Sequence, residues 1–333
     1  MRMATEFKGD GILGDGILQK RRLGRTGLEI APLVFGGNVF GWTADEKTSF
    51  ALLDRFAEAG FNTIDTADVY SRWAPGNSGG ESETIIGKWM KARGNRDRIV
   101  VVTKVGADMG QGKRDLSAGY IARAVEASLK RLQTDFIDLY LSHWPDEATP
   151  YAETLGAYQK LIEQGKVRHI GASNLDAGQL GEALKVAKDK GLPRYDVLQP
   201  EYNLYDRASY DGPLRDLCMA QDIGVITYYS LASGFLSGKY RSEADLGKSA
   251  RGEGVKHYLD ARGMRILAAL DAVSARHGAK PAEVALAWII ARPGVTAPIA
   301  SATSLAQVDS LIRSAALKLD AADIAELDQA SAA

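Results

Sequence analysis

Cysteine and histidine are scarce in this 333-residue sequence, and their scarcity argues against several kinds of site. The single cysteine, Cys218, excludes an intrachain disulfide and disfavours a cysteine-rich metal site. The four histidines, His143, His169, His257 and His277, show no spacing typical of metal ligands, so we expect no bound metal. So little cysteine fits a reducing compartment, and we expect the protein in the cytoplasm.

Long apolar runs and an excess of charge are also missing. No stretch approaches the roughly 20 apolar residues that a membrane helix needs, and the N-terminus lacks the basic start and apolar core of a signal peptide. The formal net charge of −1 gives no reason to expect nucleic acid or a membrane surface as a partner. We therefore expect a small-molecule substrate, and a monomer or weak homo-oligomer.

Three common nucleotide-binding or catalytic motifs are not found in the context that their function needs. No Gly-x-Gly-x-x-Gly follows an early strand, so a Rossmann-type dinucleotide site is not supported. The glycine-rich segment 106–112 lacks the lysine-serine ending of a phosphate loop. Residues 76–80, Gly-Asn-Ser-Gly-Gly, have the Gly-x-Ser-x-Gly spacing, but they lie in a glycine- and proline-containing loop, so no serine stands in the nucleophile elbow of that motif. These absences, with the lack of a metal pattern, argue against a hydrolase or a metalloenzyme.

Strand-like and helix-like segments alternate from Gln19 to the end of the chain. The turn residues 24–27, between two short runs, predict a β-hairpin over 23–32. Apolar runs predict buried strands at 33–36, 61–64, 99–103, 136–142, 167–171, 197–199, 224–227 and 295–299. Helical spacing predicts helices at 45–59, 83–92, 117–132 (capped by Ser117), 151–164, 176–189, 212–221, 261–277, 281–290 and 305–314.

Eight short apolar strands, each followed by a helix, predict parallel pairing with helices covering the outside. The unbroken repetition favours closure into a (β/α)8 TIM barrel over an open doubly wound sheet, which remains the alternative. The helix at 281–290 is extra and lies near the C-terminus. Residues 20–330 are expected to form one barrel. Residues 1–19, with a near repeat of 9–13 at 14–18, are expected to be a disordered tail or a cloning remnant.

Polar residues follow three successive predicted strands. Asp65 follows the second strand, with Tyr70 five residues later, and Lys104 and His143 follow the third and fourth. Active sites of such barrels lie at the carboxyl ends of the strands, so we expect these four side chains in one cluster. Singly, each has an ordinary explanation: a turn cap, a rim aromatic, a solvated lysine and a packed histidine. Their coincidence at consecutive strands weakens those explanations.

This cluster suits proton transfer to a carbonyl group. A tyrosine has an ordinary pKa of about 10, and a neighbouring cation such as Lys104 is expected to lower it. Asp65 can hold the ammonium group, and a neutral His143 can orient a carbonyl oxygen. Tyr70 is then the expected general acid. Because a proton donor cannot reduce a carbonyl alone, the natural complement is a nicotinamide cofactor as hydride source.

At these residues the sequence resembles the aldo-keto reductases, over about residues 20–330, in a branch related to the channel β subunits. Asp65-Thr66-Ala67-x-x-Tyr70, Thr103-Lys104 and Ser142-His143 are similar to that family's tetrad. The turn 171–174 is similar to its Gly-Val-Ser-Asn turn. The resemblance implies cofactor contacts for Ser173, Asn174 and Gln199 (carboxamide), Tyr228 (ring stacking), and Leu231, Ser233, Gly234 and Lys239 (pyrophosphate).

The end of the last strand departs from the family pattern. Ser301 stands where glycine is usual, and Thr303 and Ser304 stand where a basic residue for the 2′-phosphate is frequent. These side chains and Gln307 can still hydrogen-bond a phosphate, but without charge assistance. Leu311 replaces a frequent adenine-binding asparagine. We expect NADPH, the family default, and NADH is not excluded.

The substrate side is less defined. Phe40, Trp42, Trp73 and Trp144 lie in loops after the strands and are expected to wall an apolar pocket, with ordinary loop packing as the alternative. We expect an oxidoreductase that transfers a hydride from NAD(P)H to an aldehyde or ketone. The alternatives are an NADPH-binding regulatory subunit with little turnover, and a barrel isomerase or lyase without a nicotinamide.

Overall fold

The computed structural model describes residues 12–13 and 16–332. Two small antiparallel pairs precede the main fold, β1 (Ile12–Leu13) with β2 (Gly16–Ile17), and β3 (Arg21–Arg22) with β4 (Glu29–Ile30). The second pair confirms the predicted hairpin. Most of the predicted tail, 1–19, lies outside the described residues.

Eight parallel strands close into a barrel in the order β10-β11-β12-β5-β6-β7-β8-β9. They are β5 (Val34–Gly36), β6 (Thr63–Asp65), β7 (Val100–Val105), β8 (Ile137–Ser142), β9 (Val167–Ser173), β10 (Val197–Gln199), β11 (Gly224–Thr227) and β12 (Ala297–Ala300). Pairing of Val34 with Ile299 joins the first barrel strand to the last. The barrel is thereby confirmed and the open sheet is wrong.

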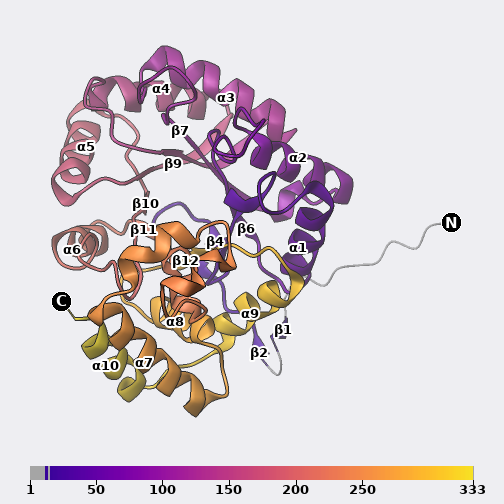
Figure 1. Cartoon of the computed structure of the whole chain (residues 1–333). Coiled ribbons are helices and arrows are strands. Elements are labelled where there is room, and N and C mark those ends of the chain that lie inside the picture. The colour runs from indigo at the N-terminus through magenta and orange to yellow at the C-terminus, as the bar shows by residue number, and fades with distance from the viewer. Residues whose placement is uncertain (1–11, 14–15, 333) are drawn as a thin grey trace.

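Helices surround this barrel, which Figure 1 shows with the strands at the centre. They are α1 (Glu46–Glu58), α2 (Glu81–Arg93), α3 (Ala118–Leu132), α4 (Tyr151–Glu163), α5 (Ala177–Lys190), α6 (Pro213–Ala220), α7 (Ala261–His277), α8 (Pro281–Ile290), α9 (Leu305–Ala316) and α10 (Ala321–Ser331). Short 3-10 helices complete the described chain: η1 (Gly37–Val39), η2 (Arg96–Arg98), η3 (Ala232–Ser237), η4 (Glu243–Lys248) and η5 (Gly252–Tyr258). No helix among the described residues has the length and apolarity to cross a membrane.

Two helix predictions need correction. Ser117 does precede α3, but its side chain makes no capping hydrogen bond. The C-terminal helix α10 is not predicted by the sequence, because few of its side chains are buried and its apolar residues show no clear helical spacing. It starts at a capping box between Asp320 and Asp323, buries Leu327 and packs beside α7 (Figure 1).

Side chains alternate along each barrel strand between the axis and the helix layer. In β7, Val102 belongs to the cluster that fills the barrel, whereas Val101 packs under the helices. The hairpin closes the amino end of the barrel with Leu23 and Ile30, which belong to the same interior cluster. This leaves the carboxyl ends of the strands for a site.

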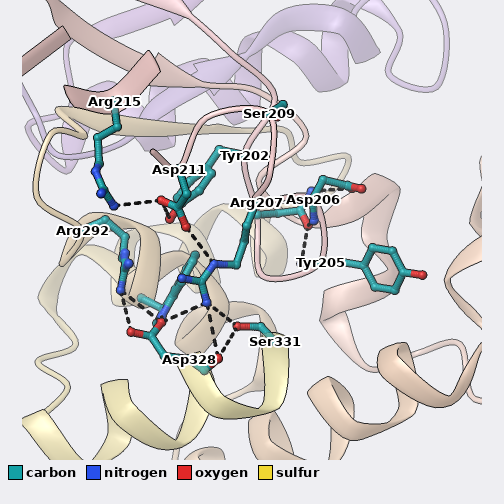
Figure 2. A network of polar contacts seen from close by, with 12 residues as sticks. Tyr202, Tyr205, Asp206, Arg207, Ser209, Asp211, Arg215, Arg292, Asp328 and Ser331 are labelled. Carbon is teal, nitrogen blue, oxygen red and sulfur yellow. Dashed lines mark hydrogen bonds and ion pairs between the residues drawn. The ribbon is translucent and has the colours of Figure 1, made fainter. Parts of the chain in front are cut away.

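A polar network ties the loop after β10 to the C-terminal helices (Figure 2). The Arg207 guanidinium donates to Asp211 at 3.0 Å, to Asp328 at 3.3 Å and to Ser331 at 2.7 Å. Asp328 also accepts hydrogen bonds from Trp288 and Arg292 of the α8 region, so α8, α10 and the loop share one carboxylate.

We expect Arg207→Met to lower the free energy of unfolding by about 2 kcal/mol, since two carboxylates lose charge-assisted hydrogen bonds in a half-buried setting. Thermal unfolding measures the loss. The matched control is Lys185→Met on α5, where an exposed ion pair to Asp189 is removed and Tm is expected not to change. Equal Tm for both variants would contradict a stabilising role for the network.

Candidate active site

A cavity of about 610 Å3 opens at the carboxyl ends of the barrel strands. Asp65, Ser173, Gln199 and Ala300, which lie at the ends of four different strands, contribute to its wall. The inward positions explain this convergence. Because Val197 of β10 points to the barrel axis, Gln199, two residues later, also points inward at the strand end.

Three of the predicted catalytic residues form one hydrogen-bonded group. The Lys104 Nζ donates to Asp65 Oδ2 at 2.8 Å, to the Tyr70 hydroxyl at 2.9 Å and to the Thr66 carbonyl at 2.8 Å. The Tyr70 hydroxyl donates to Asp65 Oδ2 at 3.2 Å. Lys104 is wholly buried and does not line the cavity, whereas its partners Asp65 and Tyr70 do. Its ammonium group therefore influences the cavity through those two side chains.

The fourth residue, His143, lies beside Tyr70, with 6.0 Å between the ring centroids. Its Nδ1 is buried and has no hydrogen-bond partner among the described residues. Burial, with the cations of Lys104 and Arg114 adding to it, lowers the pKa of His143 well below its ordinary value. The imidazole is therefore neutral at neutral pH and can donate one hydrogen bond.

The pKa of Tyr70 differs from the expectation. Burial raises it well above its ordinary value, and the Asp65 carboxylate raises it further. The prediction of a lowered pKa is wrong for the free protein, because lost hydration and a carboxylate outweigh the neighbouring Lys104. Burial likewise lowers the pKa of Lys104, while Asp65 opposes this. Tyr70 thus keeps its proton at neutral pH.

Residues expected to hold a carboxamide lie next to this group. Gln199 Nε2 donates to Asp65 Oδ1 at 2.8 Å, and the Ser173 hydroxyl donates to the Gln199 carbonyl at 2.7 Å. Asn174 has a left-handed backbone, with φ of 63°, and its Nδ2 donates to the His143 carbonyl at 2.9 Å. The Tyr228 hydroxyl donates to Asn174 Oδ1 at 2.6 Å. Ser173, Asn174, Gln199 and Tyr228 all line the cavity.

The loop after β11 bears the predicted pyrophosphate contacts. Ala232, Ser233 and Gly234 follow one another with φ of 48°, 55° and 97°. The N–H groups of Ala232 and Gly234 donate to the Tyr229 carbonyl at 2.7 Å and the Leu231 carbonyl at 2.8 Å, so this turn is held by its own hydrogen bonds. Ser233, Gly234, Lys239 and Leu231 line the cavity, and Lys239 adds a cation to this wall.

The end of β12 completes the same wall. The Ser301 hydroxyl donates to Asn38 Oδ1 at 2.6 Å. A Cβ added to Gly36 would lie 2.5 Å from the Ser301 hydroxyl, so this approach requires glycine at 36. Thr303 donates to Gln307, and both line the cavity. Ser304 does not line it; its hydroxyl caps α9 instead.

The cavity contains a cation, Arg251, that the sequence did not predict. Arg251 lines the cavity, and its guanidinium lies 5.4 Å from the ring centroid of Trp42. Its Nη2 is buried without a hydrogen-bond partner in the described part of the chain. Residues 241–251 have no apolar periodicity, so the only sequence signal was an arginine in a long loop.

The expected aromatic wall is only partly present. Trp73 and Trp144 line the cavity, and so does Tyr229, which was not predicted and is 48% exposed. Phe40 does not: it is wholly buried and stacks on Phe35 of β5, so its prediction as a pocket residue is wrong. Trp42 packs behind Trp73 at 5.7 Å between ring centroids, outside the lining.

These residues fit a phosphate-bearing nicotinamide cofactor. The cavity holds hydrogen-bonding amides and two cations, Lys239 and Arg251, of which Arg251 has a buried N–H without a partner among the described residues. Asp65 is the only acid among the described residues of its wall, and it is paired with Lys104. No group of histidine, cysteine and acidic residues in the described chain could hold a metal ion.

Comparison with known proteins gives an independent result. The model of the "Aldo/keto reductase family" matches residues 32–332. The chain is 36% identical to "Uncharacterized oxidoreductase YrpG" of Bacillus subtilis, over 90% of this chain and 91% of that protein. It is 33% identical to "Aldo-keto reductase YhdN" of Bacillus subtilis, over 86% of this chain and 85% of that protein. It is also 33% identical to "Probable voltage-gated potassium channel subunit beta" of Oryza sativa subsp. japonica, over 87% of this chain and 89% of that protein.

The matched span covers the whole barrel, every strand end of the cavity and the loop after β11. The oxidoreductase role expected from Tyr70, Lys104, Asp65 and His143 agrees with it at that general level. This chain belongs to the aldo/keto reductase family.

Proposed function

We propose that the protein reduces an aldehyde or ketone with a hydride from NADPH, with Tyr70 as the general acid. The observation that carries this is a protonated tyrosine hydroxyl at the cavity wall, held by Lys104 at 2.9 Å and Asp65 at 3.2 Å, beside a neutral histidine. Bound reduced nicotinamide would supply the hydride to the carbonyl carbon.

The chain's own residues handle the proton. His143 donates a hydrogen bond that orients the carbonyl oxygen, and Tyr70 gives that oxygen its proton as negative charge develops there. Lys104 stabilises the phenolate that forms, since its ammonium group already contacts the hydroxyl. Asp65 keeps the lysine charged and in place, and the phenolate regains a proton from water after the alcohol leaves.

The charge of the cavity suits a cofactor that carries phosphate groups, and NADPH is proposed because it is the usual cofactor of this family. Thr303, Ser304 and Gln307 carry no charge, but Lys239 and Arg251 line the same cavity and can neutralise phosphate groups. Arg251 is the stronger candidate because its buried Nη2 lacks a partner. Arg251 lies 5.4 Å from the ring centroid of Trp42, and no contact joins it to residue 303 or 304 in the described part of the chain.

Titration of the protein's fluorescence with NADPH and NADH tests the cofactor. We expect NADPH to bind more tightly, and we expect Arg251→Met to weaken NADPH about 10-fold to 100-fold, the loss of a charge-assisted hydrogen bond. The control is Arg114→Met. Arg114 stacks on Trp144 but does not itself line the cavity, so its loss is expected to leave NADPH affinity unchanged. No fluorescence change with either cofactor would favour an isomerase or lyase.

Turnover tests the reaction. We expect purified protein to consume NADPH with a simple aldehyde such as 4-nitrobenzaldehyde over many cycles. Tight retention of NADPH with negligible turnover would favour a cofactor-binding regulatory subunit. The likeness to a protein named as a probable potassium channel β subunit makes that outcome the specific competitor. The proposal includes a small-molecule carbonyl substrate, a cytoplasmic location and no nucleic-acid partner.

A further inference from the structure

One side-chain contact joins the end of β12 to the end of β5 at the cavity wall. The Ser301 hydroxyl donates to Asn38 Oδ1, and Asn38 lies in η1, directly after β5. The distance of 2.6 Å between the two atoms suits an O–H···O hydrogen bond and is short for an N–H···O bond. The amide of Asn38 is therefore held by its oxygen, and its nitrogen is left for another partner.

The nitrogen of this amide has no partner in the protein. Asn38 Nδ2 makes no hydrogen bond to any residue that the structure describes, although the side chain lines the cavity. Asn38 is only partly buried, and its nitrogen is not one of the fully buried polar atoms that lack a partner. The cavity wall thus carries an accessible N–H donor at the end of β5.

The order of the strands places this donor between two parts of the proposed site. Strand β5 lies between β12 and β6 in the closed barrel. Thr303 and Gln307, after β12, line the cavity on one side of it, and Asp65, at the end of β6, lines the cavity on the other. A cofactor that extends from the polar wall after β12 toward Tyr70 would pass the end of β5.

Ser301 has already used its only proton. A serine hydroxyl has one O–H donor, and Ser301 gives it to Asn38. An anionic phosphate oxygen needs a donor, so Ser301 can serve it directly only by releasing Asn38. Gly36 makes room for this arrangement, because a Cβ at that position would lie 2.5 Å from the Ser301 hydroxyl. The serine at 301, where glycine is usual, is thus explained by its contact with Asn38.

We propose that Asn38 is a cofactor-binding residue and that Ser301 is a positioning residue that acts through it. Asn38 Nδ2 donates a hydrogen bond to an oxygen of bound NADPH, and the Ser301 hydroxyl holds the amide in the orientation that presents this donor. This role rests on the proposed NADPH-dependent function. It gives Ser301 an indirect part in cofactor binding, in place of the direct contact expected from the sequence.

NADPH affinity, measured by titrating the protein's fluorescence, tests the donor. Asn38→Ala is expected to weaken NADPH about tenfold, the upper range for one hydrogen bond. Asn38→Asp keeps an oxygen for the Ser301 hydroxyl but has no N–H, so we expect at least the same loss. That loss should persist at about 1 M salt, which screens the added charge. If the contact were merely structural, Asn38→Asp in high salt would bind NADPH like wild type.

A double variant shows whether Ser301 acts through Asn38. Ser301→Ala alone is expected to weaken NADPH about threefold, because the amide is then free to rotate. In the Asn38→Ala background the same change is expected to add nothing, so the double variant should bind NADPH as Asn38→Ala does. Additive losses would mean that Ser301 contacts the cofactor itself, and would overturn its positioning role.

The matched control is Asn62→Ala at the amino end of the barrel. Asn62 Nδ2 donates to the Glu29 carbonyl at 2.9 Å and Asn62 does not line the cavity, so NADPH affinity is expected to stay unchanged. If Asn38→Ala does not fold, Asn38→Asp decides, since it keeps the contact with Ser301.

The outcomes separate this inference from the proposed function. A wild-type protein that binds neither NADPH nor NADH would overturn both. Wild-type binding and turnover, with unchanged NADPH affinity in Asn38→Ala and Asn38→Asp, would overturn the role of Asn38 alone. A raised KM for 4-nitrobenzaldehyde at unchanged NADPH affinity would also overturn it, because Asn38 would then contact the substrate instead of the cofactor.

Discussion

Replacing Tyr70 with phenylalanine is expected to lower kcat for aldehyde reduction by about 10³-fold, the usual contribution of a general acid. Affinity for NADPH should stay within about twofold of wild type. The ring of Tyr70 packs near Trp73, with 6.0 Å between centroids, and phenylalanine keeps that contact. Only the hydroxyl, which donates to Asp65 and accepts from Lys104, is lost.

The separation of turnover from binding is what makes this result informative. Asp65 and Lys104 still pair with each other in Tyr70→Phe, so the site does not acquire an isolated charge. Single-turnover kinetics with bound NADPH measures the chemical step directly. The matched control is Tyr151→Phe, a tyrosine at the start of α4 and outside the cavity, which should turn over normally. Full turnover by Tyr70→Phe would mean that another group protonates the oxygen.

Replacing Lys104 with methionine is expected to have the second large effect, on both activity and stability. Methionine is close to lysine in length and is apolar, so it fills the wholly buried site of Lys104. Asp65, itself 2% exposed, then loses its cation and keeps only hydrogen bonds from Gln199 and Tyr70. Leaving one member of a buried pair unpartnered costs about 3–5 kcal/mol. Turnover should fall by about 10²-fold or more, since nothing stabilises the phenolate.

A double variant separates the two roles of the lysine. Lys104→Met with Asp65→Asn removes both charges, and an asparagine amide can still hydrogen-bond at that place. We expect the double variant to recover most of the lost free energy of unfolding, measured by denaturant titration, but none of the lost turnover. If stability does not recover, the loss in Lys104→Met comes from packing rather than from the unpaired Asp65.

Local patterns were enough to place most of the secondary structure. Helices α7 and α8 have the bounds that spacing predicted, because each combines regular apolar residues with a clear start, Asp260 before α7 and Pro281 at the start of α8. Spacing did not predict helix α10, because the face that packs against the protein is only weakly apolar. Strand β7 extends past the predicted end to Val105, so Lys104 is part of the strand.

The catalytic candidates could be found because each follows a short apolar strand. Lys104 and His143 both continue an inward-facing alternation, after Val102 and Leu141 respectively. The same reasoning fails in loops, because an irregular backbone has no repeat from which the direction of a side chain can be predicted. Phe40 was therefore assigned to the cavity although it is buried, and Arg251 was overlooked although it lines the wall.

The sequence by itself determined the order of strands and helices, and which residue types stand at the strand ends. Both follow from the spacing of apolar residues along short segments of the chain. Closure of the sheet, through the pairing of β5 with β12, was decided only by the tertiary structure. So were the direction of the Tyr70 pKa and the reach of Arg251 into the cavity. The physical reason is the same for each: burial and Coulomb interactions depend on distances between segments that are far apart along the chain.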